Sequence, residues 1–249
     1  MSAKDRTRKK VNTKPPPIED LKSLSKKELI TQILGKKTRD KFLNENQKKF
    51  HDILKDNQIT ICSGPAGTGK SYLALRTAIE LISDPTTPYE KIIIIRPAVE
   101  GGEQAMGYLK GTLREKMDPY MYPSFYLLNK IIGKEATSKL EHHDIIEVMS
   151  LSFLRGINVE NALLIGEEFQ NATPSEMKLT LTRIGFNSKF FITGDIDQSD
   201  KYRNKKDSGL YDAMQRLKDI PNIGMFEFEM TDIVRNPIIS EILKKYEIS

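Results

Sequence analysis

The sequence contains one cysteine and no tryptophan among its 249 residues. One cysteine, Cys62, excludes a disulfide framework and a zinc site built from cysteines. Its place in an apolar run is typical of a small buried side chain. No apolar run approaches the roughly 20 residues that a membrane-spanning helix needs, and the first residues are polar and basic where a signal peptide would be apolar. These absences predict a soluble, cytoplasmic protein that does not bind membranes.

Excess charge of one sign is also absent from most of the chain. The whole sequence has a net charge of +5, and residues 1–17 alone carry six basic residues against one acidic residue. The remainder is therefore balanced. This arm includes three successive prolines at 15–17 and cannot bury a core, so we predict that residues 1–20 are disordered. A basic arm can bind nucleic acid through phosphates or merely keep the chain soluble, and its composition favours neither role.

The most specific motif is GPAGTGKS at 64–71, which matches G-x-x-x-x-G-K-[ST]. An apolar run at 59–62 precedes it and a helix-favouring run follows, which is the context that a phosphate-binding loop needs. In such a loop, backbone N–H groups and the positive end of the helix bind phosphate. We therefore predict a nucleoside triphosphate site in which Lys70 contacts the β- and γ-phosphates and Ser71 binds Mg²⁺. The other residues expected to contact the nucleotide are Gly64, Pro65, Ala66, Gly67, Thr68, Gly69 and Tyr72.

Short β-branched runs alternate with longer amphipathic segments from residue 59 onward, which predicts an α/β fold with a parallel sheet and helices on both faces. Strands are expected at 59–62, 92–95, 145–148, 163–165, 190–193 and 226–228. Helices are expected at 70–83, within 103–116 and 124–132, and at 174–183, 208–217 and 237–245. Capping residues Ser25 and Asn44 predict two further helices. We divide the chain into the arm, a helical extension at 21–43 and a nucleotide-binding domain at 44–249.

Two acidic residues, Glu167 and Glu168, follow the strand expected at 163–165. Ligands of parallel sheets bind at the carboxyl ends of the strands, so both carboxylates are expected near the phosphate loop. A magnesium-bound triphosphate needs a carboxylate near the metal and a group that orients the attacking water. We assign Glu167 to the metal and Glu168 to the water. We also expect their strand to lie beside the first strand in space, although other strands separate the two in sequence.

A second strand end offers neutral donors. The strand expected at 190–193 is followed by Gly194 and Asp195, with Gln198 three residues further on. A neutral donor near the transferred phosphoryl group can distinguish a triphosphate from a diphosphate. Gln198 or Thr193 is our candidate for this role.

Together these motifs resemble the PhoH family of phosphate-starvation-inducible ATPases, over about residues 44–246. The matching segments are GPAGTGKS at 64–71, RPAVE at 96–100, EFQN at 168–171, LTRIG at 181–185, TGD at 193–195 with Gln198, and DIVR at 232–235. The resemblance implies one RecA-like domain related to superfamily 1 helicase cores, with ATP and Mg²⁺ as ligands. It also implies ring-shaped oligomers, often hexamers, and RNA-linked activity in members fused to a nuclease domain. The chain is similar to compact versions without that nuclease, such as those that phages encode.

The resemblance also implies roles for single residues. Gln47 resembles a glutamine that reads adenine, and Arg96 resembles part of a helicase motif that faces the nucleic acid. Arg183 and Arg235 resemble arginines that approach the phosphates, from the same subunit or a neighbouring one, and assist catalysis. The family usually has Asp at the position of Glu167, whose carboxylate is one methylene further out. We expect this to slow hydrolysis but not binding, so that Glu167→Asp preserves or raises activity.

Three functions are compatible with the sequence. The first is an ATPase stimulated by single-stranded nucleic acid, RNA more than DNA, with translocation or unwinding. The second is a slow or inactive ATPase that acts as a nucleotide-gated regulator or scaffold. The third is a small-molecule kinase, which is disfavoured because the paired glutamates and later arginines match a site that activates water. A lone RecA-like domain needs a neighbour to complete a helicase, so we expect a homo-oligomer.

Overall fold

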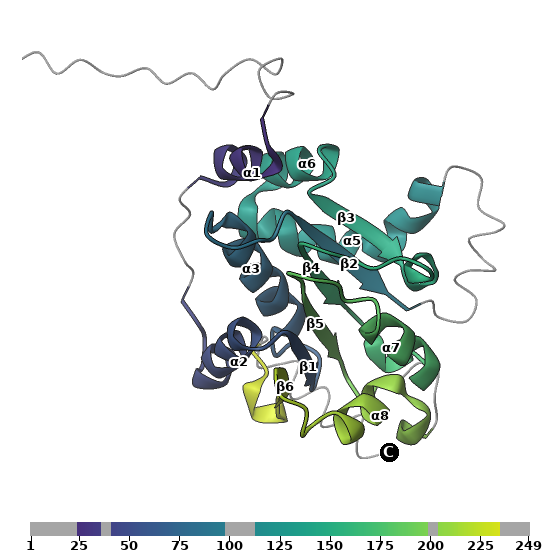
Figure 1. Cartoon of the computed structure of the whole chain (residues 1–249). Helices are drawn as coiled ribbons and strands as arrows, with labels where there is room; N and C mark the ends of the chain where they lie inside the picture. Colours follow the sequence, from purple (N-terminus) through teal and green to yellow (C-terminus); the bar gives the residue numbers. More distant parts are fainter. Residues whose placement is uncertain (1–23, 36–40, 98–112, 199–203, 235–249) are drawn as a thin grey trace, which may run out of the picture.

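Six parallel strands form one sheet in the order β3-β2-β4-β5-β1-β6 (Figure 1). The computed structural model describes residues 24–35, 41–97, 113–198 and 204–234, with backbone alone at 113–121. The strands are β1 Ile59–Ser63, β2 Lys91–Arg96, β3 Ile146–Ser150, β4 Ala162–Gly166, β5 Lys189–Gly194 and β6 Ile223–Glu227. The expected α/β fold is confirmed, and all six expected strands are present within a few residues.

Helices cover both faces of the sheet (Figure 1). Strand β2 shows why: Ile92 and Ile94 are buried in one core and Ile93 and Ile95 in the other, so both faces of the strand need apolar cover. One core includes α1 (Lys26–Leu34), α2 (Glu45–Asp56), α3 (Lys70–Ser83), α5 (Leu113–Ile132) and α6 (Lys134–His142). The other includes α7 (Pro174–Leu181), α8 (Gly209–Arg216) and the short 3₁₀ helices η2 (Leu151–Leu154) and η3 (Phe169–Asn171).

Capping residues set the helix starts as expected. Ser25 and Glu28 form a capping box at α1, and the Asn44 side chain accepts from the N–H of Gln47 at α2. Helix α1 lies in the extension expected at 21–43 and packs against α3 and α6. Helix α6 was not expected from the sequence, because its N-cap residue, Gly133, has no side chain to cap it and the helix buries only Thr137 and Leu140.

The strand that carries the paired glutamates does not lie beside the first strand. Strand β4 pairs with β2 and β5, whereas β1 pairs with β5 and β6. The expected adjacency is therefore wrong: β5 is inserted between the phosphate-loop strand and the glutamate strand. The sixth strand also begins earlier than expected, at Ile223, and ends before Phe228, whose N–H donates to the Ser63 carbonyl oxygen at 2.9 Å.

Several sequence predictions concern residues outside the described ranges. They are the arm at 1–20, the helices expected at 237–245 and in most of 103–116, and Arg235. Among the helices that the structure does describe, none has the length and apolar composition needed to span a bilayer.

The side chain of Lys189, at the start of β5, forms hydrogen bonds to the C-terminal end of α2. We expect these bonds to contribute to the stability of the fold. Its ammonium donates to the carbonyl oxygens of Lys55 at 2.6 Å and Asn57 at 2.5 Å, and burial lowers the pKa of Lys189. We expect Lys189→Met to lower the free energy of unfolding by about 1–3 kcal/mol, because the helix end loses a charged donor. A shift of the urea midpoint at constant slope would measure this.

Lys91→Met is the matched control for that measurement. Lys91 lies on β2 and pairs with Glu147 at 3.4 Å, with both side chains partly exposed. Such a pair contributes about 0–1 kcal/mol. Equal destabilisation by the two variants would contradict the capping role of Lys189.

Candidate functional site

The phosphate loop joins β1 to α3 and depends on its glycines. Gly64 has φ +149°, and a Cβ there would lie 2.7 Å from the Cβ and the carbonyl oxygen of Phe228. Gly69 has φ +94° and stands at the N-terminus of α3, where it offers no side chain as a cap. A phosphate can take the place of that cap and receive N–H groups of the first helical turn. The local structure therefore matches the predicted anion site.

Lys70 lies across this loop. Its ammonium donates to the carbonyl oxygens of Gly64 at 2.5 Å and Pro65 at 2.8 Å. Thr68 is fully buried and its hydroxyl donates to the Pro65 oxygen at 3.1 Å. The side chains of Thr68 and Lys70 therefore bond to the carbonyl oxygens of their own loop. These bonds keep the positive charge of Lys70 next to the loop.

A cavity of about 620 Å³ opens at the carboxyl ends of the strands, within the range of ligand sites. Five parts of the chain line it: the loop with the start of α3, the start of α2 with the residues before it, helix α5, the residues at and after the ends of β4 and β5, and the segment after β6. The lining residues are Lys41, Leu43, Gln47, Ala66, Gly67, Gly69, Lys70, Ser71, Tyr72, Arg76, Leu127, Lys130, Glu168, Gln170, Thr193, Gly194, Asp195, Gln198 and Val234. The structure therefore brings most of the predicted site residues together.

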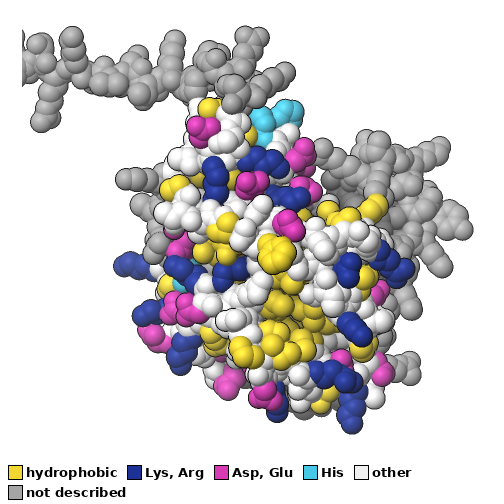
Figure 2. Space-filling model, viewed as in Figure 1, with side chains coloured by type: hydrophobic (Ala, Val, Ile, Leu, Met, Phe, Trp, Pro, Cys, Tyr) yellow, Lys and Arg dark blue, Asp and Glu magenta, His cyan; other side chains and the backbone are white. Residues whose placement is uncertain are grey.

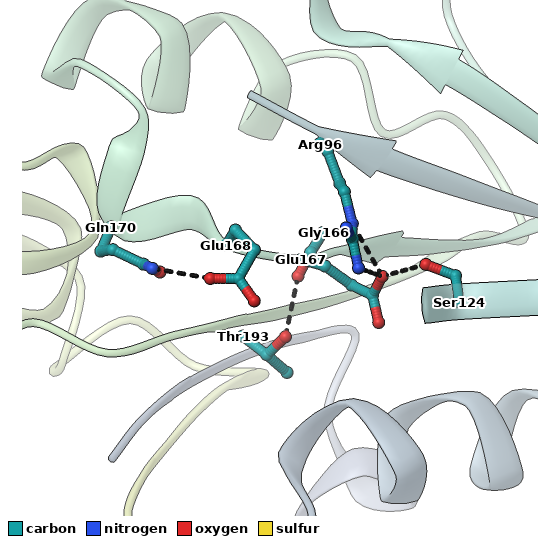
Figure 3. A network of polar contacts seen from close by, with 7 residues as sticks. All are labelled: Arg96, Ser124, Gly166, Glu167, Glu168, Gln170 and Thr193. Carbon is teal, nitrogen blue, oxygen red and sulfur yellow. Dashed lines mark hydrogen bonds and ion pairs between the residues drawn. The ribbon is translucent and has the colours of Figure 1, made fainter. Parts of the chain in front are cut away.

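Glu168 faces this cavity from a constrained backbone. Its φ is +57°, in the left-handed region that side chains seldom adopt; such conformations cluster at functional sites. Gln170 holds the carboxylate, since its amide nitrogen donates to Glu168 Oε2 at 2.7 Å (Figure 3). The Gln170 oxygen accepts from the N–H of Asp195 at 3.2 Å. Gln170 therefore links the ends of β4 and β5.

Gln170 was not among the predicted site residues. Its signal in the sequence is its place in the EFQN segment, two residues after Glu168. The close approach also explains Gly194, where a Cβ would lie 2.7 Å from the Gln170 side-chain oxygen.

Glu167 is fully buried behind the cavity wall. Its Oε2 accepts from Arg96 Nε at 3.1 Å and Nη2 at 2.9 Å, and from the hydroxyl of Ser124 (Figure 3). Its Oε1 is buried and has no hydrogen-bond partner among the described residues. The expectation that Arg96 faces nucleic acid does not fit this arrangement, because its guanidinium is bound to Glu167.

Asp195 is a third carboxyl group at this edge of the sheet. Burial raises the pKa of Asp195. The hydrogen bond from the N–H of Asp197 and the positive charge of Lys70 favour the ionised form and offset part of this effect. It lines the cavity together with Glu168. Two carboxyl groups therefore face the cavity, while Glu167 lies behind them.

Gln47 is buried in the wall of the cavity. Its oxygen accepts from the N–H of Leu43 at 2.9 Å, and its amide nitrogen donates to the Thr68 carbonyl oxygen at 3.1 Å. An amide group has two donor hydrogens and two lone pairs, so each end retains capacity for a further bond. The structure assigns Gln47 a role in supporting the loop, and adenine recognition stays a prediction.

The remaining predicted residues are Arg183, Gln198 and Arg235, and only Gln198 borders the cavity among those that the structure describes. Arg183 is not in the cavity lining: its carbonyl oxygen accepts from the N–H of Val159 at 2.9 Å, just before β4 begins. It therefore lies near the amino ends of the strands, at the opposite edge of the sheet from the phosphate loop. Gln198 is exposed at the cavity rim. Arg235 lies outside the described residues, but the N–H of Val234 donates to the Gly67 carbonyl oxygen at 3.1 Å.

The residues assigned to Mg²⁺ fit that ion. Within the described ranges no cluster of three or more His, Cys, Asp or Glu side chains could hold a metal. Mg²⁺ usually needs no such cage, because it binds through one or two protein oxygens together with phosphates and water. The buried Oε1 of Glu167 and the hydroxyl of Ser71 in the cavity can supply those oxygens.

The sequence of this chain is similar to a family model and to bacterial proteins of that family. A family model described as PhoH-like protein matches residues 41–247. A PhoH-like protein of Bacillus subtilis is 40% identical over 230 residues, which cover 92% of this chain and 70% of the relative. A PhoH-like protein of Mycobacterium tuberculosis is 42% identical over 212 residues (85% and 58%), and Protein PhoH of Escherichia coli K12 is 31% identical over 205 residues (82% and 57%).

This chain thus spans between 57% and 70% of the length of these relatives. Two solved structures, each 16% identical and each aligned over 83% of this chain, are also similar. They are the UvsW helicase of bacteriophage T4 (68% of that chain, TM-score 0.38) and the large terminase of bacteriophage HK97 (44%, TM-score 0.41). The phage-type character of the chain stays a prediction. The match to the family model and the identity to its bacterial members show that the chain belongs to the PhoH family of phosphate-loop NTPases.

Proposed function

We propose that this chain binds ATP with Mg²⁺ in the 620 Å³ cavity and hydrolyses it. The observation that carries the proposal is that one cavity joins Lys70 and Ser71 of the phosphate loop to Glu168, a carboxylate held by Gln170. Phosphoryl transfer depends on positioning and charge stabilisation, and these residues supply both. Membership of the PhoH family supports the same reaction class.

The proposed mechanism gives each residue one task. Lys70 turns from the loop carbonyls to the β- and γ-phosphates, while the N–H groups at the start of α3 bind the same anion. Ser71 and Glu167 would hold Mg²⁺, and the ion would supply positive charge to neutralise the phosphate oxygens. Glu168 orients the attacking water with the oxygen that Gln170 does not hold. Gln198, at the rim of the cavity, is the neutral donor to the γ-phosphate. The single hydroxyl hydrogen of Thr193 is donated to the Gly166 carbonyl oxygen at 3.1 Å, which leaves it no hydrogen for the phosphate.

We also propose that the chain acts as a homo-oligomer, a ring such as a hexamer, on single-stranded RNA. Arg183 lies at the opposite edge of the sheet from its own cavity, so only a second copy can bring it to a phosphate. Hydrophobic side chains gather over the middle of the face shown in Figure 2, over the strands between α3 and α7 with α8. Phe186, three residues after Arg183, is 82% exposed. Exposed apolar surface of this kind favours contact with another protein chain.

A second candidate function is an ATP-gated binder with slow turnover. The ion pair between Glu167 and Arg96 favours it, because the guanidinium already neutralises the carboxylate assigned to the metal. The kinase is disfavoured, since Glu168 and Gln170 form a water-orienting pair rather than a pocket for an acceptor.

The deciding experiment is Mg²⁺-dependent ATP hydrolysis by the full chain with and without single-stranded RNA and DNA. We expect turnover that RNA stimulates more than DNA, from a particle that light scattering records as an oligomer. Lys70→Ala should abolish both ATP binding and turnover. Lys91→Ala is the matched control, because it removes the same charge from a partly exposed pair with Glu147.

Two other outcomes would change the conclusion. Tight ATP binding with negligible turnover under every condition would favour the ATP-gated binder. Absence of ATP binding to the wild-type chain would overturn the proposed function.

A further inference from the structure

The two oxygens of the Glu167 carboxylate have different surroundings. Three donors converge on Oε2: two N–H groups of Arg96, from the end of β2, and the hydroxyl of Ser124, from α5. Oε1 is buried, has no hydrogen-bond partner in the described part of the chain, and points away from Arg96 in Figure 3. A buried acceptor without a partner is costly and calls for a ligand.

We infer that Arg96 and Ser124 are positioning residues that hold Glu167 by Oε2 and so direct Oε1 to Mg²⁺. This inference rests on the proposed function and names two residues of the metal site outside the motifs that contact the nucleotide. Ser124 is itself fully buried. Its helix also supplies Leu127 and Lys130 to the cavity wall. The same helix therefore borders the nucleotide and sets the metal carboxylate.

The length of Glu167 is part of this arrangement. The N–H of Glu167 donates to the Ile95 carbonyl oxygen at 3.0 Å, which fixes its backbone to β2 beside Arg96. With the backbone fixed, side-chain length alone decides how far the carboxylate reaches. An aspartate would end about one C–C bond, ~1.5 Å, short. The present contacts to Arg96 at 2.9 and 3.1 Å would then exceed hydrogen-bonding distance.

This reverses the expectation drawn from the sequence for Glu167→Asp. The extra methylene had suggested a displaced and less effective metal ligand. In the structure it is what allows the carboxylate to reach Arg96 and Ser124. Shortening the side chain should therefore weaken the metal site rather than improve it. Loss of a group that orients a metal ligand typically costs about 10–100-fold in metal affinity.

The test measures metal affinity separately from turnover. A fluorescent ATP analogue is titrated onto the full chain in EDTA and then at increasing MgCl₂, which gives the Mg²⁺ concentration for half-maximal enhancement of binding. We expect Ser124→Ala and Glu167→Asp to raise that concentration by about 10–100-fold and to leave the affinity in EDTA unchanged. Arg96→Lys should retain more of the response than Arg96→Met, because it keeps the charge. Lys91→Met should titrate like the wild type.

The outcomes separate this inference from the proposed function. If the wild type responds to Mg²⁺ and both Ser124→Ala and Glu167→Asp respond equally well, Arg96 and Ser124 do not position the metal ligand. Tighter Mg²⁺ binding by Glu167→Asp would overturn the inference as well. If the wild type does not bind the analogue, or binds it without any response to Mg²⁺, the proposed function fails first. Should Arg96→Met not fold, Ser124→Ala and Glu167→Asp still decide, since retained affinity in EDTA shows an intact phosphate loop.

Discussion

We expect the replacement of Glu168 with glutamine to lower ATP turnover by about a thousandfold, the usual contribution of a residue that activates the nucleophile, while the affinity for ATP should stay close to that of the wild type. Glutamine keeps the size of the side chain and its contact with Gln170, but it cannot carry the negative charge that orients and deprotonates water. Binding depends instead on the phosphate loop. Single-turnover hydrolysis together with equilibrium nucleotide binding would measure the two effects separately.

Glu160→Gln is the matched control for this experiment. Glu160 is exposed and precedes β4 at the amino end of the sheet, so the same loss of charge there should change neither quantity. Unchanged turnover in Glu168→Gln would refute the assignment of the water-activating group. Asp195, the other carboxyl group that lines the cavity, would then be the next residue to replace.

Arg183→Ala should also lower turnover, by about a thousandfold, the contribution of an arginine that stabilises the transferred phosphoryl group. Its position predicts that it acts on a neighbouring subunit, because it lies at the amino ends of the strands. Mixing Arg183→Ala with Glu168→Gln subunits should therefore restore activity. At equal amounts, random assembly of a head-to-tail ring leaves about one quarter of the interfaces with both residues intact.

The mixing experiment distinguishes the possible roles of Arg183. If both variants are inactive alone and the mixture stays inactive, Arg183 does not serve a neighbouring site. Wild-type turnover by Arg183→Ala would remove it from catalysis altogether. Arg216→Ala serves as the control, since Arg216 is exposed and pairs with Asp212 one turn away on α8.

The sequence predicted the parts of the site that are local in the chain. The phosphate loop is one continuous motif whose glycines are required by nearby backbone, and the strand Ile92–Ile95 is recognisable because both of its faces are buried. The order of the strands was not predictable in this way. The chain leaves each strand through a connection that can return on either side of the sheet, and no local pattern in the sequence shows where the next strand will pair. For this reason β4 was wrongly expected beside β1.

Residues that act through tertiary contacts were missed for the same reason. Ser124 is an ordinary serine in sequence, next to Pro123, and only the packing of α5 brings its hydroxyl to Glu167. Arg96 was recognised by its motif, but its partner lies 71 positions away. The bond between Gln170 and the N–H of Asp195 forms because β5 pairs with β4. That pairing could not be predicted from the sequence, so the role of Gln170 was missed.

That inserted strand also sets a length. With β5 between them, the ends of β1 and β4 are separated by two interstrand spacings, about 10 Å, so the loop that binds the phosphates and the carboxylate that faces water stand one strand apart. A nucleotide must extend across the end of β5, past Thr193, before a water on its last phosphate comes within reach of Glu168. We therefore expect the distance between the phosphate loop and Glu168 to select the nucleotide by its length. A triphosphate is long enough to bring its last phosphate near Glu168, whereas a diphosphate is too short.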